Sequence, residues 1–281
     1  MSSLWKNGLL ALLLVLAAGC SNANSPSDSA SSGTADTQSA STTSPPAHTA
    51  SHDPHWSYEG ETGPEYWGAL STDFETCKKG SKQSPINIDH SQLTKQTNLK
   101  PVEIHYHKAK ATIQNNGHTI QVALQDKDNY ILLDGTKYTL AQFHFHHPSE
   151  HQLDGKNAEI ELHFVHKSDD GRSAVLGVLI KSGTENAAFK QVWSHLPAKS
   201  SETANELKEQ IALTDLLPAN LHSVRYTGSL TTPPCSEDVS WTVLDHPIQM
   251  SKEQIAKFAA LFPDNHRPVQ PLGDRTVSTE G

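Results

Sequence analysis

Residues 142–151 have the sequence QFHFHHPSEH, in which polar and aromatic side chains alternate from Gln142 to His146. Successive side chains of a strand point to opposite faces, so Gln142, His144 and His146 would share one face. Phe143 and Phe145 would then point into a hydrophobic core. The stretch therefore predicts a strand on which two imidazoles, at positions i and i+2, can bind one metal ion.

A second stretch, residues 159–165 with the sequence EIELHFV, alternates in the same way. Its apolar positions fall on one face, and Glu161, His163 and Val165 fall on the other. Antiparallel pairing with the first strand would bring His163 to His144 and His146, and three neutral imidazoles with an open position are the ligand set of a catalytic zinc. The chain has 17 His, and an isolated His is usually a surface residue. Three of them on two Phe- and Leu-backed strands favour a metal site.

The overall composition limits the possible folds and partners. A chain of 281 residues, 35% hydrophobic and 19% charged, suits one large domain or two small ones. The net charge of −9 argues against nucleic acid as a partner, because neutralising phosphates requires a basic surface.

Residues 1–19 are predicted to be a signal peptide, with Lys6 ahead of an apolar run that is too short to span a membrane. Residues 16–20, LAAGC, resemble a bacterial lipoprotein cleavage site and predict lipidation of Cys20. Ala17 stands where the commonest pattern has Leu, so an ordinary secretory signal is the alternative. We therefore expect an exported protein, periplasmic or at the cell surface, which is anchored to a membrane only through a lipid.

Residues 20–51 are predicted to be a disordered tether. They are rich in Ser, Thr and Ala, and residues 21–51 contain no Leu, Ile, Val, Met or aromatic residue. Such a segment cannot bury enough apolar surface to offset its ordering entropy. Aromatic residues begin at Trp56, and the folded domain is placed at residues 52–281.

The cysteine count agrees with this organisation. Three Cys is an odd number for an exported protein. If Cys20 carries lipid, Cys77 and Cys235 remain as a pair in an oxidising compartment, where a disulfide is expected. Two buried free thiols are the alternative.

The residues from 84 to 180 are mostly short alternating runs and predict a large sheet. Strands are predicted at residues 102–106, 112–115, 118–122, 130–133 and 174–180. Asn116-Gly117 and Asp134-Gly135 are typical hairpin turns. Short helices are predicted at residues 186–195 and 202–213, and after Ser251, where a capping box begins. The fold class is therefore β-dominated α+β with short peripheral helices.

Together these motifs resemble alpha-class carbonic anhydrases of exported bacterial type, over residues 55–275. The resemblance is carried by residues 83–88 (QSPINI), 115–118 (NNGH), 142–151, 161–163 (ELH), 228–234 (GSLTTPP) and 265–272 (NHRPVQPL). It implies a single domain with a large, mostly antiparallel, twisted central sheet and Zn²⁺ at the floor of a cone. It also implies cis peptide bonds before Pro85 and Pro234, and either a monomer or a homodimer.

The resemblance assigns the zinc ligands, which are His144, His146 and His163. It assigns the acceptors that orient these imidazoles to Gln142, Glu161 and the backbone carbonyl of Asn265, which serves the remaining ligand. The other nearby histidines are not ligands in the family: His147, His151 and His166.

The implied reaction is the reversible hydration of CO2 to bicarbonate and a proton by attack of zinc-bound hydroxide. Thr231 would accept the hydrogen bond of the hydroxide and donate its own to Glu150, and Thr232 would line the same site. His118 would shuttle the proton, because the ordinary pKa of His suits transfer near neutrality. Without the family, His118 reads equally as an exposed residue beside a turn.

The resemblance also implies an apolar wall for CO2, formed by Val165, Val175, Leu230, Val239 and Trp241. From the sequence alone these residues could equally be ordinary core. Exported members of the family carry a disulfide at the positions of Cys77 and Cys235, which would pin the loop that holds Thr231.

The sequence leaves three alternative functions open. A non-catalytic member of the family would be expected to lack a ligand His. An exported zinc-binding or zinc-delivery lipoprotein would explain the abundant His but not the motif at residues 228–234. A zinc hydrolase of the protease type would be expected to carry a His-Glu-x-x-His helix, which the chain does not have.

Overall fold

The computed structural model of the chain describes residues 55–280, which belong to one compact unit. The predicted signal peptide (1–19), the lipidation site Cys20 and the predicted tether (20–51) lie outside the described residues. Within residues 55–280, no helix combines the length and apolar character needed to cross a membrane.

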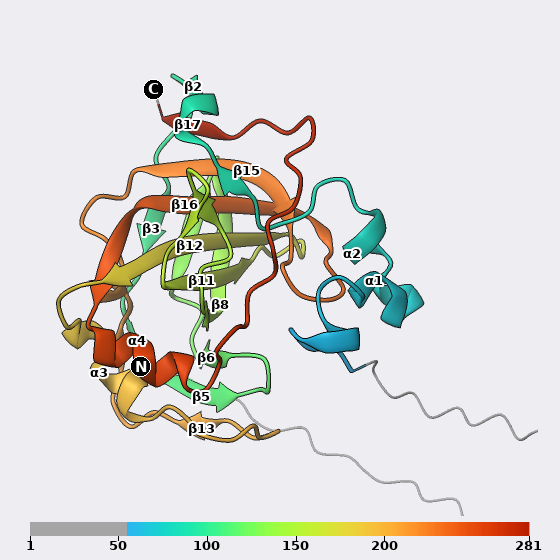
Figure 1. The fold of residues 1–281 in the computed structure, drawn as a ribbon. Helices are drawn as coiled ribbons and strands as arrows, with labels where there is room; N and C mark the ends of the chain where they lie inside the picture. The colour runs from blue at the N-terminus through green and yellow to red at the C-terminus, as the bar shows by residue number, and fades with distance from the viewer. Residues whose placement is uncertain (1–54, 281) are drawn as a thin grey trace, which may run out of the picture. The chain divides into compact units, whose positions relative to one another are not determined.

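A 12-stranded sheet forms the centre of the fold, with the strand order β13-β5-β6-β8-β11-β12-β16-β15-β17-β2 (Figure 1). Off this path, β7 pairs with β8, and β3 pairs with β7. Its strands are β2 (Thr94–Gln96), β3 (Glu103–His105), β5 (Ala111–Asn115), β6 (Ile120–Leu124), β7 (Tyr130–Leu133), β8 (Thr136–His146), β11 (Ile160–Lys167), β12 (Ser173–Ser182), β13 (Asn205–Glu206), β15 (Ser223–Ser229), β16 (Glu237–Met250) and β17 (Ser278–Glu280).

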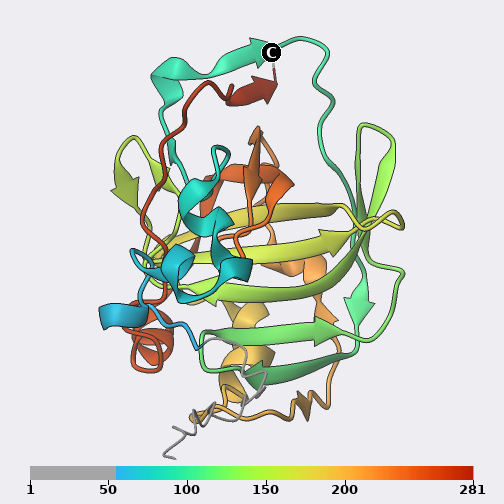
Figure 2. The ribbon, with the colours of Figure 1, turned by 90° about the vertical axis from the view of Figure 1, so that its right-hand side faces the viewer.

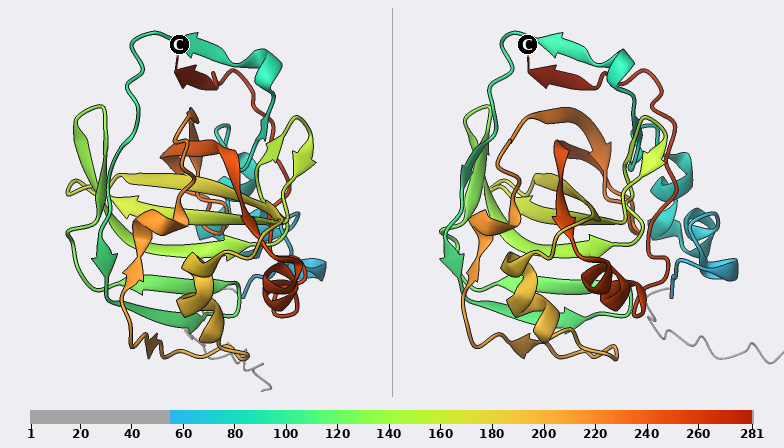
Figure 3. Two further views of the ribbon diagram at one scale, coloured as in Figure 1. Left: turned by 90° about the vertical axis from the view of Figure 1, so that its left-hand side faces the viewer. Right: turned by 60° about the vertical axis from the view of Figure 1, so that its left-hand side comes forward.

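The sheet is mostly antiparallel, as predicted. Parallel pairing occurs between β12 and β16 and between β17 and β2, and the other neighbours in the sheet are antiparallel. Strands β2 and β17 lie side by side at the top of Figures 2 and 3, although they come from opposite ends of the described chain. The predicted β-dominated fold class is confirmed.

Both predicted hairpin turns are present. Strands β5 and β6 pair across Asn116-Gly117, where Gly117 has φ +89°. Strands β7 and β8 pair across Asp134 and Gly135, whose φ values are +49° and +81°. In this second turn both central residues have positive φ, which matches the right-handed twist of the flanking strands and fixes the register of the long strand β8.

Shorter elements surround the sheet. A small three-stranded sheet contains β1 (Asn87–Ile88), β9 (Gln152–Leu153) and β10 (Lys156–Asn157). A two-stranded sheet contains β4 (Lys108–Ala109) and β14 (Ile211–Ala212). The helices are η1 (Gly60–Thr62), α1 (Trp67–Leu70), η2 (Thr72–Phe74), α2 (Thr76–Lys79), η3 (His90–Gln92), η4 (Ala187–Phe189), α3 (Lys190–Ser194), η5 (Leu213–Leu216) and α4 (Lys252–Ala259).

Two of the three predicted helices form. Residues 187–194 are helical, and α4 begins with the predicted capping box, in which Ser251 and Gln254 bond reciprocally. The helix predicted at residues 202–213 is wrong. That segment supplies β13, which pairs with β5, and β14, which pairs with β4, so sheet edges elsewhere in the chain determine its conformation.

The two faces of the sheet are different, as the alternation predicted. One face carries Phe143, Phe145 and Phe164, all fully buried. Helices α3 and α4 cover this face: the ring of Phe145 lies 5.0 Å from Trp193 and 5.8 Å from Phe258. The opposite face carries the predicted metal ligands.

Three peptide bonds before proline are cis: Ser84–Pro85 and Pro233–Pro234, as predicted, and His147–Pro148, which was not predicted. Cys77 and Cys235 form the expected disulfide, which joins helix α2 to the loop after β15.

Candidate metal centre

The register of β8 and β11 brings the three predicted ligands together. His163 is the direct cross-strand partner of His144, and His146 lies two residues further along β8. The ring centroids are 4.6–5.3 Å apart, and one ligand nitrogen from each ring lies within 4.8 Å of the others. The three histidines that the alternation placed on one face therefore lie together in the fold.

A protein acceptor holds the second nitrogen of each imidazole on β8. Nδ1 of His144 donates to Oε1 of Gln142 at 2.9 Å, and Nδ1 of His146 donates to the backbone carbonyl of Asn265 at 2.7 Å. Since both acceptors can only accept, the protons are held on Nδ1 and the Nε2 atoms of the two rings are left to bind a metal.

Glu161 occupies the corresponding place for His163. Its Oε1 lies 3.0 Å from Nε2 of His163, which leaves Nδ1 of this ring for a metal. Its Oε2 accepts hydrogen bonds from the backbone N–H groups of Glu150 and His151. Burial by itself would raise the pKa of the Glu161 carboxyl, but His151 and His163 hold that pKa well below its ordinary value. Glu161 is therefore a buried carboxylate.

His151 is the functional neighbour that sequence reasoning missed. It is fully buried; its Nδ1 bonds to Oε1 of Glu161 at 2.8 Å, and its Nε2 bonds to the hydroxyl of Tyr226 at 2.6 Å. Tyr226 in turn bonds to Ser84. His151 is not a member of the three-His group, but with Glu161 and His163 it forms a second group whose ligand atoms lie within 4.8 Å of one another. Nothing local to residues 142–151 indicates Tyr226 as its partner.

Burial keeps the three ligand imidazoles neutral. It lowers the pKa of His144 and His163, and that of His146 to about 4. Neutral imidazole is the form that a metal requires. Nε2 of His146 is also buried without a hydrogen-bond partner in the described part of the chain, as expected for an atom reserved for a metal. The donor set and this orphaned nitrogen fit Zn²⁺.

Glu150 lies beside the ligands and is fully buried. Its Oε1 accepts a hydrogen bond from the backbone N–H of Arg267 at 2.8 Å, and its Oε2 lies 3.5 Å from Nε2 of His146. Burial raises the pKa of the Glu150 carboxyl, although His163 and the hydroxyl of Thr231 act in the opposite direction. Thr231 therefore lies near Glu150, whose Oε2 has no hydrogen-bond partner among residues 55–280.

An apolar cavity of about 230 Å³ opens on one side of the ligands. Val165, Val175, Leu230 and Trp241 line it together with His144, His163, Thr231 and Thr232. Of the five predicted wall residues, Val239 alone is absent from this lining; it is buried behind it in the cluster that contains Val175 and Trp241.

A second cavity of about 120 Å³ lies on the polar side of the ligands and is lined by His118, Trp56, Thr232 and the rings of His144 and His146. The imidazole of His118 stacks on the indole of Trp56, with centroids 3.7 Å apart and planes 8° from parallel. Burial lowers the pKa of His118, and His55 adds to this effect. The predicted shuttle residue therefore faces the same space as two of the ligands.

The loop that carries Thr231 is held at both ends. Ser229 bonds to Ser84 through both its N–H and its hydroxyl, and its carbonyl accepts a hydrogen bond from the indole of Trp241 at 2.9 Å. The N–H of Cys235 bonds to the carbonyl of Thr232 at 2.8 Å, and Cys235 is joined to Cys77. The disulfide thus ties this loop to the N-terminal helices.

His147 and His166 are not members of the three-His group. Nδ1 of His147 donates to the carbonyl of Pro263. His166 points into the core, where its Nε2 bonds to the hydroxyl of Tyr106 at 2.7 Å.

The sequence profile of the family described as eukaryotic-type carbonic anhydrase matches residues 62–281. A carbonic anhydrase of Klebsiella pneumoniae is 48% identical over 225 residues, which is 79% of this chain and 90% of that protein. The solved structure of alpha-carbonic anhydrase from Thermovibrio ammonificans, in complex with the inhibitor sulfanilamide, has a TM-score of 0.78 and 44% identity, and the match covers 81% of this chain and 100% of that one.

The relatives do not all carry the same name. Dioscorin DB3L of Dioscorea polystachya is 34% identical over 224 residues, which is 76% of this chain and 81% of that protein.

Proposed function

The chain belongs to the eukaryotic-type carbonic anhydrase family, whose activity is the hydration of CO2, and we propose that it hydrates CO2 reversibly to bicarbonate and a proton in a zinc-dependent reaction. The observation that carries this proposal is the group of His144, His146 and His163 at the meeting point of an apolar and a polar cavity. CO2 is small and apolar, whereas the proton product requires a polar exit, so the two-sided site matches the reaction.

Zn²⁺ would be held by Nε2 of His144, Nε2 of His146 and Nδ1 of His163. When bound, the metal supplies the acidification of water to a pKa of about 7, so that hydroxide is available near neutral pH. Gln142, the carbonyl of Asn265 and Glu161 hold the other ring nitrogens, which fixes the orientation of each imidazole before the metal arrives.

Thr231 and Glu150 orient the attacking oxygen in this proposal. The hydroxyl of Thr231 accepts a hydrogen bond from the nucleophile and donates its own to the Glu150 carboxylate, so that a lone pair faces CO2. The position of Thr231 in the cavity lining and its effect on the pKa of Glu150 support this arrangement. The N–H of Arg267 holds the other oxygen of Glu150 in place.

Val165, Val175, Leu230 and Trp241 provide the surface on which CO2 rests. Their side chains are apolar and exclude water from one side of the site, and Lys167 and Gln142 also line this cavity.

His118 receives the proton and passes it to buffer. Its lowered pKa leaves the ring neutral at pH 7 and hence able to accept a proton. Stacking on Trp56 holds the ring at the edge of the polar cavity, and this support was not foreseen from the sequence.

Stopped-flow measurement of CO2 hydration, combined with zinc quantification, tests the proposal. Wild-type protein should hydrate CO2 and contain about one zinc per chain, whereas His144→Ala should lose most of its hydration activity and most of its zinc. His107→Ala, which removes an exposed His outside the site, is the matched control. Full zinc occupancy without hydration would instead favour zinc storage or delivery.

We also propose export as a lipoprotein, with cleavage before Cys20 and a tether of residues 20–51. The pattern LAAGC supports this proposal, and the Cys77–Cys235 disulfide is compatible with an oxidising compartment. Expressed in a bacterial host, Cys20→Ser should move the protein from the membrane fraction to the released fraction, and a wild-type protein without a lipid on Cys20 by mass spectrometry would contradict the anchor. Size-exclusion chromatography would decide between the monomer and the homodimer.

A further inference from the structure

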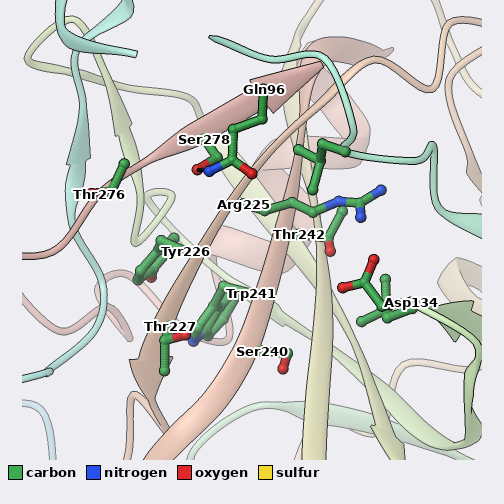
Figure 4. Close-up of a pocket in the computed structure, with 12 residues that line it drawn as sticks. Gln96, Asp134, Arg225, Tyr226, Thr227, Ser240, Trp241, Thr242, Thr276 and Ser278 are labelled. Atoms are coloured by element: carbon green, nitrogen blue, oxygen red, sulfur yellow. Dashed lines mark hydrogen bonds between the residues drawn. The ribbon is translucent and has the colours of Figure 1, made fainter. Parts of the chain in front are cut away.

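A third cavity, separate from the two beside the metal centre, lies against strands β15, β16 and β17 (Figure 4). It has a volume of about 240 Å³, and Trp241 contributes to its wall as well as to the wall of the apolar metal-side cavity. The polar side chains that matter here are those of Arg225, Thr242, Ser240, Ser278, Gln96 and Asp134.

Cross-strand pairing explains why this part of the sheet is polar. Arg225 on β15 is the direct partner of Thr242 on β16 and of Ser278 on β17. Val224 and Tyr226, the neighbours of Arg225 along β15, belong to the apolar cluster that contains Trp241, and Tyr226 and Trp241 also contribute to the wall of this cavity. The alternation of strands therefore places a charged side chain on a face that short hydroxyl side chains line.

Arg225 is nearly buried, with 11% of its side chain exposed. Its Nε and Nη2 atoms have no hydrogen-bond partner among residues 55–280, and neither has the hydroxyl oxygen of Thr242, which is 1% exposed. An unpaired buried donor destabilises the folded state, and more strongly if it is charged. Three such atoms around one cavity are therefore not explained by packing.

The two unpaired nitrogens of Arg225 are also geometrically related. Nε and Nη2 form the edge of the guanidinium group that offers two parallel N–H bonds. This edge is the one that binds carboxylates, carbonates, sulfates and phosphates through two oxygens at once.

Two carboxylates of the chain lie near Arg225, but neither accepts a hydrogen bond from this edge. Oε1 of Glu280 forms a long ion pair with Nη2, at 3.8 Å, and accepts a hydrogen bond from Ser223. Asp134 is exposed, so water screens its charge. Burial lowers the pKa of Arg225 even though Glu280 and Asp134 act to raise it, which means that these carboxylates do not fully compensate the buried cation.

We propose that this cavity is a binding site for a small oxyanion, which the Nε and Nη2 atoms of Arg225 bind through two oxygens and which the hydroxyl of Thr242 binds through a third contact. Gln96 and Ser278, bonded to each other at 2.7 Å, close the side opposite β16 and hold β2 against β17. Bicarbonate, the product of the proposed reaction, and inorganic sulfate have the required chemistry. The site itself rests on Arg225 and does not depend on the proposed function.

Crystallography of the zinc-loaded protein in selenate, an anomalous scatterer with the shape of sulfate, tests the location directly. The expected result is an anomalous peak within hydrogen-bond distance of Nε and Nη2 of Arg225. Ordered water at this position in crystals with saturating selenate would overturn the proposal.

Thermal melting in sulfate and in bicarbonate, at ionic strength matched with sodium chloride, tests binding in solution. An anion at ten times its dissociation constant should raise the Tm of the wild type by roughly 3–6 °C more than that of Arg225→Gln. Thr242→Val should reduce the difference, and Arg225→Lys, which keeps the charge but loses the two-pronged edge, should not restore it. Arg172→Gln removes an exposed arginine and is the matched control, with an unchanged response.

Taking the difference between variants removes the effect of anions at the metal centre and the general stabilisation by sulfate, because both are shared. If Arg225→Gln responds to both anions as the wild type does, the cavity does not bind them and the proposal is wrong. A response to bicarbonate alone or to sulfate alone supports the site and identifies which source of anion fills it.

Discussion

Gly177 decides how closely β12 can approach the metal centre. It is the direct partner of His163 across β11 and β12, and a Cβ atom at this position would lie 2.9 Å from Oε1 of Glu161. The carboxylate that orients His163 therefore rests against a bare backbone. A glycine within the apolar run 174–180 is otherwise unfavourable in a strand.

Gly177→Ala is expected to displace the Glu161 carboxylate and to weaken metal binding by about 10- to 100-fold, because the imidazole of His163 loses its fixed orientation. Competition with a fluorescent zinc chelator measures this affinity. Ser182→Ala, at the end of the same strand, is the control and should bind zinc like the wild type. An unchanged affinity in Gly177→Ala would show that the carboxylate can move without cost to the site.

His118 offers a prediction about proton transfer. In weak buffer, His118→Ala should lower the maximal rate of CO2 hydration by at least about 10-fold, because no other residue of the polar cavity lining has a suitable pKa except the metal ligands. Added imidazole should restore the rate, and the metal content should stay unchanged. A rate in weak buffer equal to that of the wild type would remove the shuttle role.

At the scale of elements, strands β8 and β11 show why the site was predictable. Period-two alternation is local, so it separates the Phe-bearing face from the His-bearing face without knowledge of the partner strand. The helix predictions had different outcomes. The capping box at Ser251 is also a local pattern and was confirmed. Residues 202–213 instead contain the short strands β13 and β14, because β5 and β4 present unpaired backbone groups to them.

The loop after β15 is the element whose stability depends most on a cross-link. The Cys77–Cys235 bond spans 158 residues and holds this loop to helix α2, which also contacts Arg267 through the carbonyl of Cys77. Reduction, or the Cys77→Ser/Cys235→Ser double variant, should destabilise the protein by about 2–5 kcal/mol because the unfolded chain gains entropy. Calorimetry with and without reductant measures the Tm. Reductant should lower the Tm of the wild type, whereas the Tm of the double variant, which has no disulfide to reduce, should stay unchanged.

At the scale of the whole molecule, buried neutral histidines make stability depend on pH. His166 accepts a hydrogen bond from Tyr106 and donates one to the carbonyl of Ala174, and burial lowers its pKa to about 3. An unfolded His has a pKa of about 6.5. Between pH 6.5 and pH 3, the unfolded state therefore binds a proton that the folded state does not.

The free energy of unfolding is therefore highest above pH 6.5, and it decreases as the pH falls toward 3, by about 1.4 kcal/mol per pH unit for this one group. His166→Gln, which retains an acceptor for Tyr106, should reduce the slope of unfolding free energy against pH in this window. His107→Gln, an exposed His, is the control. Urea unfolding between pH 4 and pH 7 measures the slope, and an equal slope in both variants would contradict the assignment.

The sequence by itself determined the sheet-rich fold class, the hairpin turns, and the grouping of His144, His146 and His163 with Gln142 and Glu161 beside them. Each of these follows from residues that are near neighbours in the chain, where strand alternation and turn chemistry act. Only the tertiary structure decided that His151 and Tyr226 brace Glu161, that residues 202–213 contain the short strands β13 and β14 in place of a helix, and that Arg225 lines a cavity with unpaired nitrogens. Those outcomes depend on which distant segments become neighbours, and side-chain patterns within one segment do not encode that.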